Sequence, residues 1–113
     1  SIHDTYQKTG YVMDTHTAVA AHVCGQYRVK SGDQTKCVIA STASPYKFVK
    51  SVMSAIDAEN ANADEFDLLP KLQEVSGVPM PQAIKDILDA KVLHDLECVA
   101  DKMKDTVKGI LGV

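Results

Sequence analysis

A continuous apolar run, Cys37-Val-Ile-Ala40, leads directly into hydroxyl side chains and a helix start, and this order limits the folds open to the chain. Apolar runs with β-branched members are typical of strands that are buried on both faces of a parallel sheet. Ser41 and Thr42 end the run, and the pair Ser44-Pro45 supplies an N-cap and a first-turn proline for a helix. We therefore expect an α/β fold with one buried parallel strand near residues 36–42.

This junction between strand and helix also indicates a ligand site. Open α/β sheets bind ligands beyond the carboxyl ends of their parallel strands. The free N–H groups and the dipole at a helix start suit an anion or the polar edge of a cofactor. Because Ser41 and Thr42 would lie at that point, their hydroxyls are candidate ligand contacts.

Apolar spacing predicts helices over much of the remaining chain. A short helix over residues 2–8 is expected to stop at Gly10. The next helix is expected to begin at Asp14 or Thr15 and to run to about Tyr27, interrupted or ended near Gly25. The other expected helices open at Pro45, Pro70 and Pro81, and a last one of roughly 16 residues carries Leu96, Ala100, Met103, Val107 and Ile110 in register.

Residues 57–64 are polar and acidic without periodicity, so we predict a linker there. The linker would separate residues 1–56, part of an α/β domain, from a helical segment over residues 65–113. One strand cannot satisfy its own backbone N–H and C=O groups. Either weaker strands lie at residues 9–13 and 28–31, or the chain is a piece of a larger α/β protein.

Charge and apolar patterning narrow the expected partners. Residues 1–56 carry six Lys or Arg against three Asp, whereas residues 57–113 carry six Lys against twelve Asp or Glu. No basic stripe is interleaved with aromatic residues, so we expect no nucleic-acid partner. No apolar run approaches the ~20 residues of a membrane span, and the start lacks the pattern of a signal peptide. We expect neither a membrane partner nor export.

The cysteines and histidines predict no metal site. Cys24, Cys37 and Cys98 have spacings that fit no metal motif, and the histidines form no ligand pair with them. Cys24 on an alanine-rich helix and Cys37 in the strand are expected to be small core residues. Free cysteines are typical of a reducing compartment, so we expect a cytoplasmic protein.

Two motifs in order resemble the C-terminal part of threonine synthase: Thr9-Gly-Tyr-Val-Met-Asp-Thr-His-Thr-Ala-Val-Ala20 and Ala40-Ser-Thr-Ala-Ser-Pro-Tyr-Lys-Phe48. Members of that family typically show Gly-Tyr before Asp/Glu-Pro-His-Thr/Ala-Ala-Val-Ala, and later Thr-Ala-x-Pro-x-Lys-Phe at a strand end. The resemblance is strong over residues 9–56 and looser afterwards. Thr15 stands where the family usually has proline, which is favourable at a helix start but not required.

The resemblance implies the fold of the C-terminal portion of a tryptophan-synthase-β-like enzyme, which is pyridoxal-phosphate fold type II. It implies a role in threonine synthase, a lyase that acts on phosphates and converts O-phosphohomoserine and water to threonine and phosphate. The family's Schiff-base lysine and glycine-rich phosphate loop lie in its N-terminal part. We therefore expect an inactive fragment without a catalytic residue, which does not bind the cofactor alone and which self-associates through unpaired strand edges.

By the same resemblance, the hydroxyl of Thr42 would meet the pyridine nitrogen of the cofactor, although it could instead bond a nearby carbonyl. His16, in a helix first turn, could reach the active site or serve only in capping and packing. Lys47 could face the substrate phosphate or remain solvated. The alternative function is a stand-alone helical interaction module without an active site.

Overall fold

The structure, a computed structural model, describes residues 1–113 and is built from helices without a strand. The α-helices are α1 (Ile2–Thr9), α2 (Thr15–Ser31), α3 (Val49–Ile56), α4 (Glu65–Ser76), α5 (Gln82–Leu88) and α6 (Met103–Leu111). The 3₁₀ helices are η1 (Pro45–Phe48), η2 (Ala58–Asn62) and η3 (Ala100–Lys102). The helix-rich character expected from the sequence is confirmed.

Side-chain caps and glycines decide where several helices begin and end. Of the two cap candidates, Asp14 and Thr15, it is Asp14 that caps α2. Ser44 caps η1 by accepting from the Tyr46 amide at 3.3 Å, as the sequence predicted. The predicted break at Gly25 is wrong, because α2 runs through it to Ser31 and ends at Gly32, whose φ is 71°. A single glycine inside a helix costs only about 1 kcal/mol, which the rest of a long helix tolerates.

The α4 helix begins earlier than the sequence predicted. The Asp64 side chain accepts from the Phe66 amide at 2.9 Å and starts the helix at Glu65, so Pro70 lies inside it rather than at its first turn. Gly77, with φ of 65°, ends the helix as expected.

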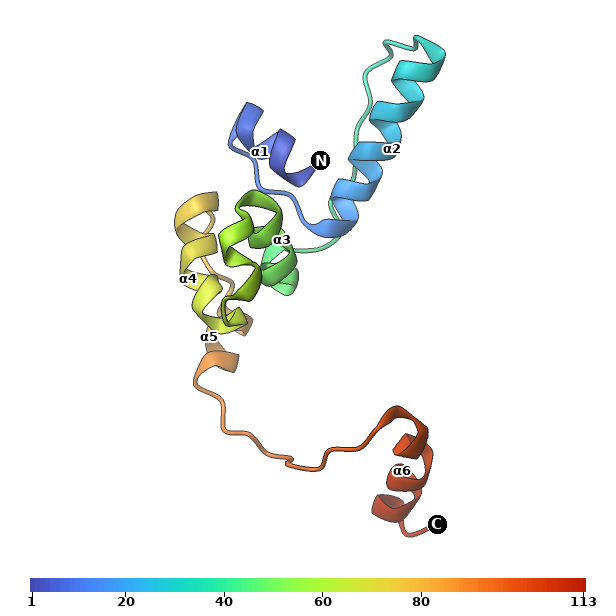
Figure 1. Cartoon of the computed structure of the whole chain (residues 1–113), viewed down its shortest axis with the longest axis vertical. Coiled ribbons are helices and arrows are strands. Elements are labelled where there is room, and N and C mark those ends of the chain that lie inside the picture. The colour runs from blue at the N-terminus through green and yellow to red at the C-terminus, as the bar shows by residue number, and fades with distance from the viewer.

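The core forms around α3, which packs against α1, α4 and η2 (Figure 1). Its residues Val49, Val52 and Met53 are buried at the i, i+3 and i+4 spacing of one helix face. They meet Ile2 of α1, Val12 and Met13 of the following extended step, and the α4 residues Leu68, Leu69 and Leu72. Residues 57–64, predicted as a linker, contain η2, which packs on α3.

The expected buried strand does not form. Residues 36–42 are extended and run back along α2, which projects from the core (Figure 1), but their side chains are largely exposed, Val38 by 89%. No backbone–backbone hydrogen bond involves residues 36–42. The physical reason is that a strand needs neighbours for its ladder, and residues 9–13 and 28–31 form none. Cys37, expected in the core, is therefore exposed, and Cys24 is half-buried.

The C-terminal region lies apart from the core. Residues 89–99 are irregular and lead to η3 and α6, which stand away from the other helices (Figure 1). The predicted last helix is thus confirmed only from Met103 onward; Leu96 lies before it, exposed and without a surface to pack on. Amphipathic segments need such a surface, because most helical stability in proteins comes from packing of the apolar face.

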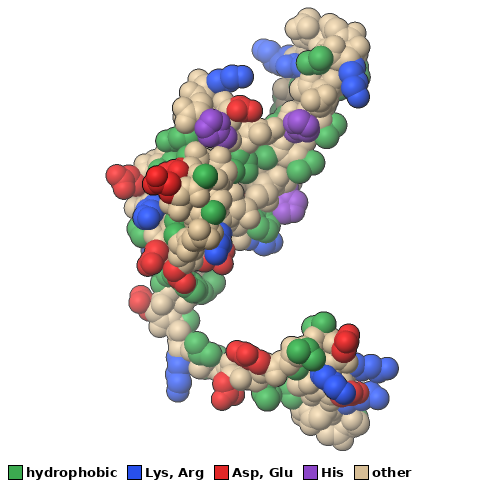
Figure 2. Space-filling view, viewed as in Figure 1, with side chains coloured by type: hydrophobic (Ala, Val, Ile, Leu, Met, Phe, Trp, Pro, Cys, Tyr) green, Lys and Arg blue, Asp and Glu red, His purple; other side chains and the backbone are tan.

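The molecule is open in shape. Its radius of gyration is 18.9 Å and its extents are 60 × 32 × 25 Å, whereas a compact chain of this length has a radius of about 13 Å. Figure 2 shows in space-filling form that α2 and the C-terminal region with η3 and α6 extend away from the core, and that both carry hydrophobic side chains on their surface. Among the helices, none combines the length and the apolar character that crossing a membrane requires.

Candidate functional site

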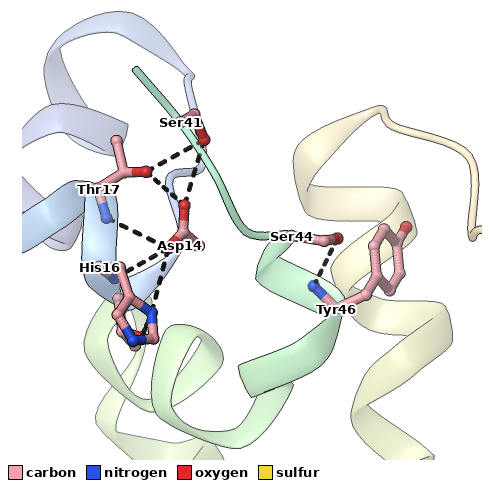
Figure 3. Close-up of polar contacts among 7 residues, drawn as sticks. Asp14, His16, Thr17, Ser41, Ser44 and Tyr46 are labelled. Carbon is pink, nitrogen blue, oxygen red and sulfur yellow. Dashed lines mark hydrogen bonds and ion pairs between the residues drawn. The ribbon is translucent and has the colours of Figure 1, made fainter. Parts of the chain in front are cut away.

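A buried carboxylate, Asp14, joins the start of α2 to the end of the extended segment (Figure 3). Its oxygens accept from the backbone amides of His16 at 2.9 Å and Thr17 at 3.2 Å, and from the Thr17 hydroxyl. The Ser41 hydroxyl donates to the same carboxylate at 3.2 Å, and Thr17 Oγ1 lies 3.1 Å from Ser41 Oγ. We name these three side chains, Asp14, Thr17 and Ser41, the Asp14 cluster.

The Asp14 cluster is electrostatically arranged to keep its carboxylate ionised. The Asp14 side chain is fully buried, and burial by itself would raise its pKa. The donors from Thr17, His16 and Ser41 together outweigh burial and lower the pKa of Asp14 below its ordinary value of 3.8. The start of α2 also favours a negative charge at this position.

The cluster fixes the backbone directly before Thr42. Ser41 and Thr42 are both exposed, but Ser41 is tied to Asp14, whereas the Thr42 hydroxyl makes no hydrogen bond within the chain. On the other side, Ser44 caps η1, and the buried Tyr46 donates its hydroxyl to the Val78 carbonyl at 2.5 Å. Burial raises the pKa of the Tyr46 phenol, so the donor stays protonated. Thr42 therefore lies between two residues whose positions are fixed by hydrogen bonds, Ser41 and Ser44.

His16 and Lys47, predicted separately as site residues, both lie against the ring of Phe48. The His16 ring centroid is 5.0 Å from that of Phe48, and Lys47 Nζ is 5.6 Å from the same ring. His16 Nδ1 also lies 3.7 Å from the Asp14 carboxylate, although its side chain is 66% exposed. The structure thus joins His16 to the Asp14 cluster and brings Lys47 to the same aromatic ring.

Sequence reasoning missed the central role of Asp14, which it identified only as a possible helix cap. It also missed Phe48 as the residue that meets both His16 and Lys47. A signal was present in Asp14-Thr-His-Thr17, because an aspartate followed three residues later by threonine places a hydroxyl beside the cap. The contact with Ser41, 27 residues away, has no local signal.

Thr42 and Lys47 at this junction carry exposed hydrogen-bond donors of the kinds that a cofactor such as pyridoxal phosphate can accept from. The exposed hydroxyl of Thr42 can donate to or accept from a ring nitrogen. The exposed ammonium of Lys47 can donate to phosphate or carboxylate oxygens. No group of three or more His, Cys, Asp or Glu side chains is arranged to hold a metal ion.

Comparisons with known proteins all find similarity to one family. The family model described as threonine synthase, C-terminal, matches residues 17–107. The mouse protein threonine synthase-like 1 (Mus musculus) is 34% identical over 103 residues, which are 89% of this chain and 13% of that protein. Threonine synthase-like 1 of Pongo abelii is 33% identical over 79 residues, 70% of this chain and 10% of the relative. The human protein (Homo sapiens) is 32% identical over 79 residues, with the same shares.

Proposed function

The chain belongs to the threonine synthase C-terminal family, and we propose that it is the C-terminal part of a cytoplasmic threonine synthase. The complete enzyme would convert O-phosphohomoserine and water to threonine and phosphate with pyridoxal phosphate as its cofactor. This segment would contribute a cofactor contact and part of the active-site wall. It would contribute no covalent catalytic group, so the isolated chain would be inactive.

The Asp14 cluster is the observation that carries this proposal. A buried, ionised carboxylate with several donors defines a rigid point in an otherwise open molecule. That point lies immediately before Thr42, the residue that the family motif aligns with the cofactor contact. A hydroxyl that must meet a ring nitrogen gains from such an anchor, because catalytic groups lose efficiency when their position varies.

Each residue would have a limited task. Pyridoxal phosphate, when bound, supplies the electron sink for carbanion chemistry on the amino acid substrate. The neutral hydroxyl of Thr42 would hold the cofactor's ring nitrogen without giving it a full proton. Lys47 would attract the substrate phosphate, and His16 would form the neighbouring wall against Phe48.

A longer polypeptide would cover the apolar side chains and the backbone groups that this chain leaves exposed. The chain spans only 13% of the length of the mouse relative. Its segment over residues 36–42 is extended with free backbone groups, and α2 exposes Val19, Val23 and Tyr27. We propose that residues 36–42 become a buried parallel strand once neighbouring strands from the rest of the enzyme are present, as in an α/β enzyme of fold type II.

A chimera tests the proposal. The matching C-terminal segment of an active threonine synthase is replaced by residues 1–113, and the chimera is expressed in a bacterium that lacks its own threonine synthase. Growth without threonine, together with phosphate release from O-phosphohomoserine by the purified chimera, is the expected result. A chimera that folds and binds pyridoxal phosphate but releases no phosphate would contradict the proposal.

The isolated chain provides the matched control. It is expected to release no phosphate and to give no saturable, borohydride-sensitive absorbance band with pyridoxal phosphate, because covalent catalysis needs its nucleophile in place. A specific band of this kind, or phosphate release by the chain alone, would show that the chemistry does not depend on a missing N-terminal part.

One observation favours a second function, a stand-alone helical interaction module. Exposed apolar side chains on α2 and α6, including Val23, Tyr27 and Ile110, suit docking to another protein. A chain made in the source cell at only this length would support the module. A longer product that carries the same residues would support the enzyme.

A further inference from the structure

Two cysteines on neighbouring segments of the chain line the same two surface pockets. Cys24 lies on α2, and Cys37 lies on the extended segment that runs back along this helix (Figure 1). Both residues line an open, apolar surface groove of about 680 Å³, together with Val23, Tyr27 and Val38. Both also line a smaller hollow of about 190 Å³, together with Arg28 and Asp33.

Hydrogen bonds on both sides hold the segment beside the helix. Arg28 donates to the Thr35 carbonyl at 2.6 Å, and the Tyr27 hydroxyl donates to Asp33 at 3.2 Å. At the far end, Ser41 is tied to the Asp14 carboxylate. Between these ties, residues 36–40 make no backbone–backbone hydrogen bond, so this stretch can move toward α2 at little cost.

The Cys24 side chain affects the ionisation of the Cys37 thiol. Interaction with Cys24, followed by partial burial, raises the pKa of the Cys37 thiol. Cys37 is exposed and Cys24 is half-buried, so a small soluble reagent can reach the pair. Cys98 lies in the irregular segment between α5 and η3, which stands apart from α2 (Figure 1), and provides an internal comparison.

We propose that Cys24 and Cys37 form a reversible intramolecular disulfide by exchange with a low-molecular-weight disulfide such as glutathione disulfide. One thiolate attacks the glutathione disulfide, forms a mixed disulfide and releases one glutathione thiolate. The second cysteine thiolate then attacks the protein sulfur of the mixed disulfide and releases the second glutathione. Two protein thiols are thus oxidised, one glutathione disulfide is reduced to two glutathione molecules, and the two thiol protons pass to the released glutathione.

The bond would fasten the segment that carries Ser41 and Thr42 to the middle of α2. It needs neither the cofactor nor any other part of a threonine synthase, so it stands or falls independently of the proposed function.

Peptide mapping tests the pairing directly. The reduced chain is incubated with glutathione disulfide and digested with trypsin without a reductant. Cleavage after Lys8, Arg28, Lys36 and Lys47 places Cys24 in the peptide 9–28 and Cys37 in the peptide 37–47. We expect these two peptides joined, with the loss of two hydrogen atoms, and separated again by dithiothreitol. Cys98→Ser should leave the joined peptide unchanged, and Cys24→Ser or Cys37→Ser should abolish it.

A second measurement separates folded geometry from mere closeness in sequence. In glutathione redox buffers, the folded chain should form the bond at a glutathione disulfide level about tenfold lower than the urea-unfolded chain, because folding raises the effective concentration of the thiols. Equal midpoints in buffer and urea would overturn the proposal. Separate glutathione adducts on both cysteines, or bonds only between copies on a non-reducing gel, would overturn it as well.

Discussion

At the scale of single residues, Asp14 has more partners than a helix cap needs. Its carboxylate satisfies two amides of α2 and two hydroxyls, one of them from Ser41 across the molecule. Asp14→Ala should lower the free energy of unfolding by about 1–3 kcal/mol, because a cap is lost and buried donors are left unpaired. Urea unfolding followed by circular dichroism measures this change. The exposed Asp4 provides the control, since Asp4→Ala should change stability by less than about 0.5 kcal/mol.

The lowered pKa of Asp14 also predicts a pH dependence. Since the folded pKa lies below the ordinary value of 3.8, the unfolded chain binds this proton more readily than the folded chain. The stabilisation is complete above the unfolded pKa and is lost as pH falls through the folded pKa, from about pH 5 downward. Asp14→Asn should therefore flatten the decline of stability in acid. Parallel acid titration curves for the wild type and the variant would show that other carboxylates control the decline.

Thr42 differs from Ser41 because its exposed hydroxyl is not bonded to the Asp14 cluster. In the active chimera, Thr42→Val should lower kcat and cofactor affinity while leaving unfolding by urea nearly unchanged. Valine keeps the shape but removes the hydroxyl, which leaves its partner unpaired at a cost of about 1–3 kcal/mol. Thr42→Ser should restore most of the activity. If Val and Ser variants have the same kcat and cofactor affinity as the wild type, Thr42 does not contact the cofactor.

At the scale of elements, α3 and residues 36–42 differ in backbone hydrogen bonding and in burial. The α3 helix has its hydrogen bonds and a buried face, whereas residues 36–42 have extended backbone and no ladder. In a dilute solution of the isolated chain, the amides of residues 36–42 should exchange with deuterium at rates close to those of an unfolded peptide. The amides of α3 should exchange much more slowly. In the active chimera, residues 36–42 should become protected. Strong protection in the dilute isolated chain would mean that the segment finds a partner within these 113 residues.

At the scale of the whole molecule, the open shape predicts self-association. Free backbone groups at residues 36–42 and the exposed apolar side chains Val23, Tyr27 and Val38 form one surface along α2. Such surfaces and edges favour association with other chains. Sedimentation at increasing concentration should show a dimer or larger species, which the double variant Val23→Lys, Val38→Lys shifts toward the monomer.

The control for this prediction is Val92→Lys. Val92 is equally apolar and exposed but lies between α5 and η3, away from that surface. A compact monomer at high concentration, with cooperative unfolding, would contradict the prediction and weaken the argument that the chain needs a larger partner.

Local signals account for the parts of this protein that could be predicted from its sequence. The Asp14 and Ser44 caps, the stop at Gly77 and the apolar face of α3 were all expected, because each depends on residues within a turn or two. The same holds for family membership, which rests on two contiguous motifs and is confirmed by the family match over residues 17–107. The His16 and Thr42 hypotheses came from these motifs, and their roles remain predictions.

Tertiary structure decided the features that depend on contacts between residues far apart in the sequence. The bond from Ser41 to Asp14 joins residues that are 27 positions apart, and no local pattern encodes it. The run Cys37–Ala40 has the composition of a buried strand, yet it lies exposed because pairing and burial are properties of a sheet rather than of a segment. Apolar residues such as Leu96 likewise have helical spacing without a surface to stabilise a helix. Sequence by itself determined which conformations each segment favours, and only the packing around it decided which of them it keeps.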